Sequence, residues 1–283
     1  MMKTVFVVNP KAGQGRNVES FIEKIKYVAE KNGIDAVIYL TKAIGDATAF
    51  VRDYCETHGA ARFIACGGDG TLGEVVNGAI EYENCEVGVI PLGTGNDFCR
   101  NFVQEYSFSD IEAQLLGYTT KCDAIRYISN VNGVLKTGYC VNMFNIGFDC
   151  NVADMTAKMK QKPFISGSMA YFLSIFAILI KKKGANLEIE LDGERKHRGP
   201  LLLTSLANGC FCGGGIKSNP LASIKDGRIN INIIYNISRL NFLTKLPYYM
   251  KGTHINLKNI DRIKSLLYYN IKRKKLYSRR FYD

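Results

Sequence analysis

The stretch RFIACGGDGTLGEVVNG, residues 62–78, decides the fold of this chain. Its first five residues form a mostly apolar run that predicts a buried strand, and Gly67 and Gly68 bring that strand to an end. A helix is expected from about Leu72 to Ile80. A strand, a glycine-rich turn and a helix in this order are typical of a parallel sheet whose faces are covered by helices.

The same alternation of strand and helix extends on both sides of this stretch. Further strands are predicted at 4–9, 36–40 and 86–90, and helices at 17–32 and 46–55. Residues 1–122 are therefore expected to form a doubly wound α/β domain. Ligands bind such sheets at the carboxyl ends of their strands.

The pattern changes after about residue 122, where short β-rich runs replace the alternation. These runs are 124–129, 134–143, 187–191, 200–206 and 229–235, and the pairs Asn132-Gly133, Asp192-Gly193 and Asp226-Gly227 are turn signals between them. A second, mainly antiparallel β-rich domain is therefore predicted over 123–283, with a helix at 164–181 inserted.

The composition bounds the class of protein. Apolar residues make up 47% and charged residues 22% of the 283, which indicates a globular chain long enough for two domains. Nine cysteines occur without a CxxC pair, which favours reduced thiols over disulfides or zinc. The first ten residues lack the apolar centre of a signal peptide. We therefore expect a cytoplasmic protein.

Two features raise the question of a membrane. The uncharged segment 164–180 is shorter than the about 20 apolar residues of a spanning helix, so we favour a helix packed on its own protein, with a lipid-contacting surface as the alternative. The net charge of +11, concentrated in the tail, suits an anionic membrane, although a solvated tail is an equal alternative. No nucleic-acid-binding motif is present. We expect a protein peripheral to the membrane, and a homodimer stays open.

Three polar, glycine-rich segments follow the first, third and fourth predicted strands. They are NPKAGQGR (9–16), GGDGT (67–71) and PLGTGND (91–97). Because the carboxyl ends of parallel strands lie at one edge of a sheet, these loops are expected to converge there. Bare backbone N–H groups in such loops make an anion cradle, and the nearby basic residues Lys11 and Arg16 would favour phosphates.

Two carboxylates lie inside this predicted cradle. A carboxylate such as Asp69 would repel phosphates unless it binds Mg²⁺ or a transferable proton, so it indicates one of these two roles. Asp97, next to Asn96, supplies a second carboxylate. Each signal has an ordinary alternative, since Asp69-Gly70 could be a plain turn and Asp97 a helix N-cap. The chain has no Walker A loop, no GxGxxG fingerprint after its first predicted strand and no protein-kinase motif set.

The order and spacing of NPKAGQGR, GGDGTLGEVVNG and PLGTGNDFCRNF resemble the diacylglycerol kinase catalytic family, which also contains sphingosine, ceramide and bacterial lipid kinases. TKAIGDA (41–47), NIGFDCNV (145–152), LANGCFCGGG (206–215) and PLASIKDGRINI (220–231) resemble its further blocks, so the likeness covers roughly residues 4–254. It implies an α/β nucleotide domain similar to phosphofructokinase and NAD kinases, followed by a β-sandwich domain.

The resemblance also implies site residues and cofactors, ATP and Mg²⁺. The nucleotide contacts it implies are Asn9, Pro10, Lys11, Ala12, Gly13, Thr41, Gly67, Gly68, Asp69, Gly70, Thr71, Leu72, Gly73 and Thr94, to which the cradle argument adds Asn96 and Asp97. Asp69 would be the catalytic residue, in a magnesium–water network near the γ-phosphate. A structural Mg²⁺ is implied at Ser223, Asp226 and Arg228, with a plain hairpin turn as the alternative.

One departure from the family pattern concerns the general base. Soluble bacterial members of the family carry a late DGE-type motif whose glutamate is the proposed general base, whereas here DGE occurs once, at 192–194, where the family has a turn. The resemblance fades after His254, and we expect an altered or truncated C-terminus. The general base stays unassigned.

The function expected from these patterns is ATP- and Mg²⁺-dependent phosphorylation of a lipid hydroxyl. Diacylglycerol is the first candidate substrate and phosphatidic acid the product, which belongs to phospholipid metabolism. The alternatives are a small-molecule kinase similar to NAD kinases and a catalytically impaired regulator that binds nucleotide or lipid.

Overall fold

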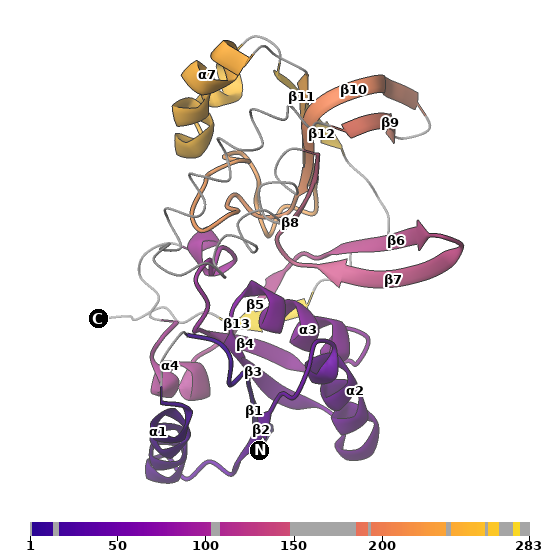
Figure 1. Ribbon diagram of the computed structural model, residues 1–283. Coiled ribbons are helices and arrows are strands. Elements are labelled where there is room, and N and C mark those ends of the chain that lie inside the picture. Colours follow the sequence, from indigo (N-terminus) through magenta and orange to yellow (C-terminus); the bar gives the residue numbers. More distant parts are fainter. Residues whose placement is uncertain are drawn as a thin grey trace. The chain divides into compact units, whose positions relative to one another are not determined.

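The computed structural model describes residues 2–13, 17–102, 108–147, 185–191, 194–235, 239–257, 260–265 and 274–277. The chain forms two compact units, the first made of Met1–Val141 with Tyr269–Asp283 and the second of Asn142–Tyr268 (Figure 1). The first unit thus extends beyond residue 122, because a β-hairpin that follows this residue contacts a helix of the first unit.

The first unit is built on a six-stranded sheet in the order β2-β1-β3-β4-β13-β5. Strands β1, β2, β3 and β4 pair in parallel, whereas β13 pairs antiparallel with β5 at the edge. The strands are β1 (Lys3–Val8), β2 (Ala36–Leu40), β3 (Ala61–Gly67), β4 (Glu86–Pro91), β5 (Thr119–Cys122) and β13 (Lys274–Tyr277). The four parallel strands match the strands predicted from the sequence.

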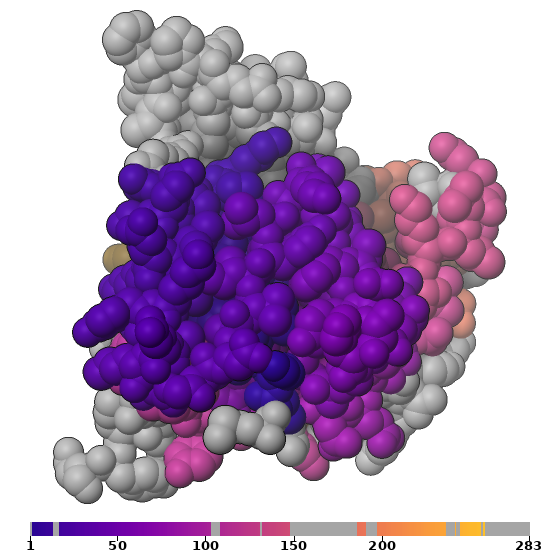
Figure 2. Space-filling view, turned by 90° about the horizontal axis from the view of Figure 1, so that it is seen from below, coloured from indigo at the N-terminus to yellow at the C-terminus, as the bar shows by residue number. Residues whose placement is uncertain are grey.

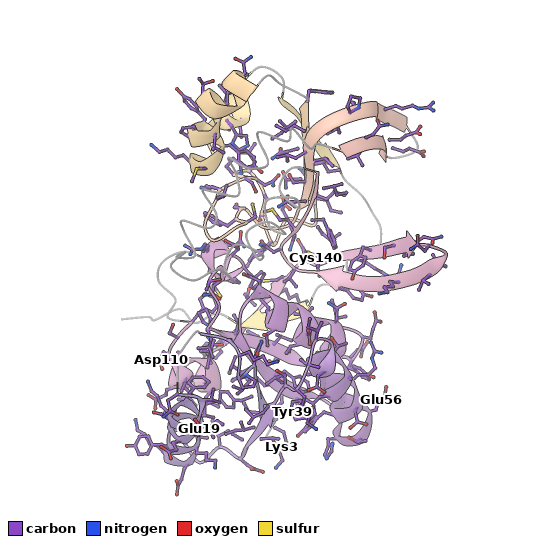
Figure 3. All side chains as sticks on the ribbon, viewed as in Figure 1. Lys3, Glu19, Tyr39, Glu56, Asp110 and Cys140 are labelled. Atoms are coloured by element: carbon purple, nitrogen blue, oxygen red, sulfur yellow. The ribbon has the colours of Figure 1, made fainter. Side chains whose placement is uncertain are left out.

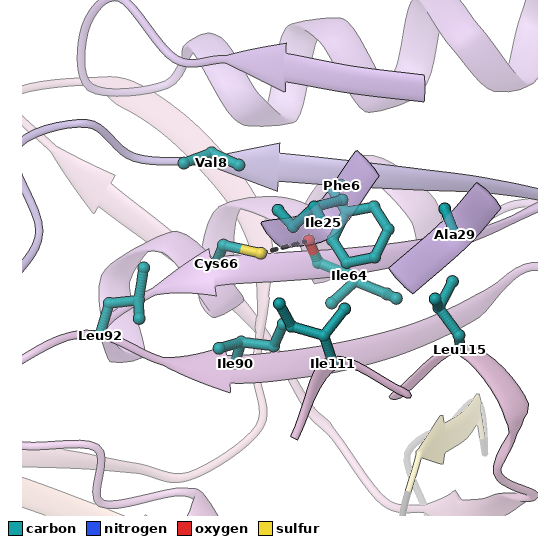
Figure 4. Close-up of a cluster of buried hydrophobic side chains, with 10 residues drawn as sticks. All are labelled: Phe6, Val8, Ile25, Ala29, Ile64, Cys66, Ile90, Leu92, Ile111 and Leu115. Atoms are coloured by element: carbon teal, nitrogen blue, oxygen red, sulfur yellow. Dashed lines mark hydrogen bonds between the residues drawn. The ribbon is translucent and has the colours of Figure 1, made fainter. Parts of the chain in front are cut away.

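Helices cover both faces of this sheet. They are α1 (Val18–Lys31), α2 (Asp46–His58), α3 (Asp69–Ala79) and α4 (Ile111–Leu116), with a 3₁₀ turn η1 at Cys99–Asn101. Figure 4 shows one face, where Phe6, Ile64 and Ile90 pack against Ile25 of α1 and Ile111 of α4. The alternate strand residues face α2 and α3, as where Phe63 meets Tyr54 edge-on. Burial on both faces explains the continuous apolar runs of the sequence.

A two-stranded antiparallel hairpin completes the first unit. Strands β6 (Ile125–Val131) and β7 (Val134–Cys140) are joined by Asn132 and Gly133, which have φ of 53° and 83°. Positive φ at both residues of a two-residue turn suits the right-handed twist of the strands, and Asn-Gly adopts it readily. The predicted Asn132-Gly133 turn is confirmed.

The second unit is built on an antiparallel sheet in the order β12-β11-β10-β8, with β9 paired to β10. Its strands are β8 (Met143–Gly147), β9 (Ala185–Leu191), β10 (Glu194–Ala207), β11 (Ile229–Tyr235) and β12 (Ile260–Ser265), and its helical parts are α7 (Arg239–Lys251) and η2 (His254–Asn256). The antiparallel second domain predicted from the sequence is confirmed.

The helix predicted at 164–181 lies outside the described residues, and so does the pair Asp192-Gly193. No helix among the residues that the structure describes is long and apolar enough to cross a membrane.

Candidate functional site

The three glycine-rich loops meet at the carboxyl edge of the first sheet. The Asn9 N–H, just past β1, donates to the carbonyl of Cys66 at 2.9 Å, and the Leu92 N–H, just past β4, donates to the carbonyl of Gly67 at 2.8 Å. Both loops are therefore hydrogen-bonded to the end of β3, and the structure brings the predicted segments together.

Glycine is required where these loops touch. A Cβ on Gly93 would lie 2.5 Å from the Gly68 Cα and 2.9 Å from the Asn96 Oδ1, and a Cβ on Gly67 would collide with the side chain of Thr71. Real Cβ atoms do not approach other atoms this closely, so a side chain at Gly93 would force two loops apart and one at Gly67 would displace Thr71. Gly70 and Gly73 have open space around them instead.

Asp69 joins the loop after β3 to the loop after β4. It is the first residue of α3, and its Oδ2 accepts the N–H of Asp97 at 3.1 Å while its Oδ1 accepts the N–H of Phe98 at 3.0 Å. A carboxylate that accepts two backbone N–H groups makes charge-assisted bonds, stronger than neutral ones. Asp69 therefore fixes the position of the loop that contains Thr94 and Asn96.

The loop after β4 also closes on itself. Asn96, at φ 52°, accepts the Gly93 N–H at 3.1 Å and donates to the Gly93 carbonyl at 2.7 Å. The Arg100 guanidinium donates to the Gly95 carbonyl and lies 3.7 Å from the buried Asp97 carboxylate. Thr94 stands exposed at the tip of this loop, where a ligand could reach it.

Asn9 performs a similar role in the loop after β1. Its Oδ1 accepts the Lys11 N–H at 3.0 Å and its Nδ2 donates to the Thr71 Oγ1 at 3.3 Å, so it ties this loop to the start of α3. Pro10, Lys11, Ala12 and Gly13 follow at the same edge, with Lys11 exposed and Gly13 at φ 83°. Arg16 lies outside the described residues.

Thr41 lies beside β1, because its N–H donates to the Val8 carbonyl at 2.9 Å. The turn between Thr41 and α2 is ordered by Asp46, the first residue of that helix. The Asp46 carboxylate accepts the Lys42 N–H at 2.7 Å and the Tyr39 hydroxyl at 3.0 Å. Burial, and then the neighbouring Asp46 carboxylate, raise the pKa of Tyr39, which Figure 3 labels. The sequence motif TKAIGDA contained Asp46, but its ordering role was not predicted.

The carboxylate of Asp69 also affects a neighbouring thiol. Burial, and secondarily the charge of Asp69, raise the pKa of Cys99 to about 12. Cys99 therefore stays a neutral thiol at physiological pH and is no nucleophile.

The predicted magnesium residues of the second unit form a turn before β11. The Asp226 Oδ1 accepts the Arg228 N–H at 3.1 Å, the Ser223 Oγ accepts the Lys225 N–H at 3.4 Å, and Gly227 has φ 68°. Among the described residues, no group of three His, Cys, Asp or Glu side chains is arranged to hold a metal. Carboxylate and backbone oxygens suit Mg²⁺, so this site stays a prediction.

A parallel α/β sheet with phosphate-type glycine loops at one edge, joined to an antiparallel β unit, defines a class of two-domain nucleotide-dependent enzymes. Two family models match this chain. The diacylglycerol kinase catalytic domain covers residues 3–127, and the YegS C-terminal NAD kinase beta sandwich-like domain covers 142–269.

Individual relatives agree with these matches. The diacylglycerol kinase of Staphylococcus aureus (strain Newman) is 34% identical over 231 residues, which span 80% of this chain and 68% of that protein. The diacylglycerol kinase of Bacillus subtilis (strain 168) is 28% identical over 264 residues, which span 92% and 82%. A crystal structure of a diacylglycerol kinase from Bacillus anthracis str. Sterne has the same fold, with a TM-score of 0.61, 22% identity and coverage of 93% and 83%.

The chain therefore belongs to the diacylglycerol kinase catalytic-domain family. The kinase family and the two-domain fold expected from the sequence are both confirmed.

Proposed function

We propose that this protein is an ATP- and Mg²⁺-dependent lipid kinase that phosphorylates a lipid hydroxyl, with diacylglycerol as the first candidate and phosphatidic acid as the product. The observation that carries the proposal is the convergence of the three loops: the carboxylate of Asp69 joins the loops after β3 and β4, and Asn9 attaches the loop after β1. Relatives named diacylglycerol kinase support the choice of substrate.

The loops offer what a triphosphate requires. The first turn of α3 begins at Asp69 and presents N–H groups that lack acceptors within the helix, and the helix dipole favours an anion there. Gly68 and Gly93 let backbone approach closely, and the exposed Lys11 supplies positive charge. These residues would bind and orient the phosphates, which provides most of the catalysis in phosphoryl transfer.

The chemistry of Asp69 also fits a role beside Mg²⁺. Each carboxylate oxygen has two lone pairs, so Asp69 can hold the N–H groups of Asp97 and Phe98 and still accept a water from a hydrated cation. When bound, Mg²⁺ neutralises charge on the phosphates. Asp226, with backbone oxygens of Ser223 and Arg228, would hold the structural Mg²⁺ that the family resemblance implies.

The replacement Asp69→Asn tests this function. An amide retains one acceptor oxygen but turns N–H groups toward the Asp97 or Phe98 N–H, so it loses both the charge and one loop contact. We expect phosphoryl transfer from [γ-³²P]ATP to diacylglycerol to fall at least about a hundredfold, because a neutral amide would hold a hydrated cation less well and leave the phosphate charge less neutralised. Thin-layer separation of the labelled phosphatidic acid measures it.

Asp110→Asn is the matched control. Asp110, labelled in Figure 3, also accepts two backbone N–H groups, those of Glu112 and Ala113, but it does so at the start of α4. Activity should survive this change. If Asp69→Asn kept full turnover, or if both variants lost it equally, the role given to Asp69 would be wrong.

The substrate is tested with a panel that contains diacylglycerol, sphingosine, ceramide and NAD. NAD is included because the model that matches the second unit is described as NAD kinase beta sandwich-like. Label on NAD alone would support the small-molecule alternative. Nucleotide binding without transfer to any acceptor would support a regulatory protein.

A further inference from the structure

The β6–β7 hairpin presents apolar side chains to solvent. Ile128, Val134 and Leu135 are 62%, 57% and 69% exposed. Figure 2 shows the hairpin, in pink, standing out from the side of the first unit. Three large aliphatic residues exposed near the end of one short ribbon are unusual for a surface with no binding role.

The strand register places these side chains on defined faces. Ile128 pairs with Thr137, and Leu135 pairs with Asn130, so Ile128 and Leu135 share one face as diagonal neighbours. Val134 lies on the opposite face, directly after the turn. Aliphatic side chains therefore flank both faces of the outer end of the ribbon.

Basic residues accompany these apolar ones. Arg126 and Lys136 are exposed on the hairpin. Arg126 lies farther from the Asn132-Gly133 turn than all three aliphatic residues, whereas Lys136, paired with Ser129, lies between Leu135 and Ile128. No aspartate or glutamate occurs in the sequence between Asp123 and Asp149. The outer part of the ribbon thus combines exposed aliphatic side chains with cations and carries no acidic residue, which suits an anionic lipid surface.

The base of the hairpin is held firmly to the first unit. The Asn77 side chain of α3 donates to the Tyr139 carbonyl and accepts the Tyr139 N–H, both at 2.8 Å, and the Tyr139 hydroxyl bonds Glu81. The Tyr127 ring lies over Gly138, where a Cβ would approach its hydroxyl to 2.6 Å. An isolated two-stranded hairpin is marginally stable, so these contacts keep the exposed end in a fixed position.

We propose that the outer end of this hairpin docks on an anionic lipid bilayer, with Ile128, Val134 and Leu135 entering the interface and Arg126 and Lys136 meeting lipid phosphates. The inference rests on the proposed function, because an enzyme that acts on a membrane lipid must reach the bilayer. Insertion stays shallow, because the unpaired edges of a two-stranded ribbon cannot be buried in hydrocarbon.

Vesicle flotation of the full chain tests the docking. The probes are vesicles of phosphatidylcholine with and without phosphatidylglycerol. The double replacement Ile128→Ser with Leu135→Ser should weaken binding to the anionic vesicles by at least about tenfold, which corresponds to about 1.4 kcal/mol and to partial burial of the two side chains. Lys136→Gln should weaken it about fivefold, which corresponds to roughly 1 kcal/mol per basic residue. The control is Tyr27→Ser, which removes a 67% exposed residue of α1 and should leave binding unchanged.

A second measurement separates this inference from the function on which it rests. The hairpin variants should phosphorylate a short-chain, water-soluble diacylglycerol at the wild-type rate and lose activity only on diacylglycerol in vesicles. If the wild type phosphorylated no lipid, the proposed function would fail, yet flotation would still report on the hairpin. Equal vesicle binding by the wild type and the double variant would overturn the docking. A dimer in light scattering that the double variant abolishes would overturn it too, in favour of a second copy of this chain.

Discussion

Gly93 lies against Gly68 with no room for a side chain, and this contact sets the spacing of two site loops. Replacement Gly93→Ala places a Cβ at 2.5 Å from the Gly68 Cα, so backbone must move. We expect unfolding free energy to fall by about 1–3 kcal/mol, as for other overpacked sites. ATP affinity, measured by calorimetry, should fall with it, because the displaced loop carries Thr94.

Gly73→Ala provides the comparison in the same motif. A Cβ on Gly73 meets nothing within 4 Å, and the residue lies inside α3. Alanine should therefore raise stability by about 0.5–1 kcal/mol. A loss of ATP affinity in this stable variant would come from contact with the nucleotide itself. If Gly93→Ala were as stable as Gly73→Ala, the proposed loop contact would be wrong.

Residue type pointed to positions that the structure brings together at one edge of the sheet, but not to the bonds that hold them there. Gly68, Gly93 and Asp69 stood out because glycines and an acid after buried strands are typical of phosphate loops. The bonds from Asp69 to the N–H groups of Asp97 and Phe98 join residues far apart in sequence. They depend on how two strands lie side by side, which no local pattern encodes.

At the scale of elements, α3 connects the glycine-rich loops to the β6–β7 hairpin through Asn77. Asn77→Ala removes the bonds to both backbone groups of Tyr139 and the bond from its Nδ2 to the Gly73 carbonyl. We expect a loss of about 2–3 kcal/mol in unfolding free energy, because buried backbone groups lose partners. Hydrogen exchange should rise across 125–140 and stay unchanged in β3.

Tyr139→Phe is the control for this prediction. It removes the hydroxyl that bonds Glu81 but keeps both backbone bonds to Asn77. Its effect on exchange in the hairpin should be smaller. If both variants loosened 125–140 equally, the side-chain amide of Asn77 would not be the main attachment of the hairpin.

Three of the predicted strands share one physical property. Strands β1, β3 and β4 are buried on both faces, so their apolar runs are continuous and glycine or proline marks their ends. Helix α4 and strand β5 were missed because each is too short to develop a clear period. Strand β13 was missed because its pairing with β5 joins distant parts of the chain.

At the scale of the whole molecule, the sequence changes from an alternation of helices and strands to a series of short strands. This change correctly predicted two domains with different folds. The exact boundary could not be predicted, because β6 and β7 have the pattern of the second domain but attach to the first unit through α3. Two units with separate sheets are expected to respond separately to damage in their interiors.

The buried polar cluster of the second unit allows that expectation to be tested. Asn219, 2% exposed, accepts from the Asn232 Nδ2 of β11 at 2.6 Å and donates to the Ser205 Oγ of β10 at 2.9 Å. Asn219→Ala leaves polar groups on both strands with fewer partners, so we expect a loss of about 2–4 kcal/mol. Hydrogen exchange should rise in 201–207 and 229–235 and stay unchanged in 61–67.

Asn32→Ala is the complementary replacement in the first unit. Asn32 ends α1, where its Nδ2 donates to the Val28 carbonyl at 2.8 Å and to the Glu112 carboxylate of α4 at 3.0 Å. Exchange should then rise in α1 and α4 and leave the second sheet protected. Both replacements remove an asparagine side-chain amide, one from each unit. If exchange rises only in the unit that carries the replacement, the two units unfold as independent cooperative units. A rise throughout the chain in either variant would mean that the units unfold as one.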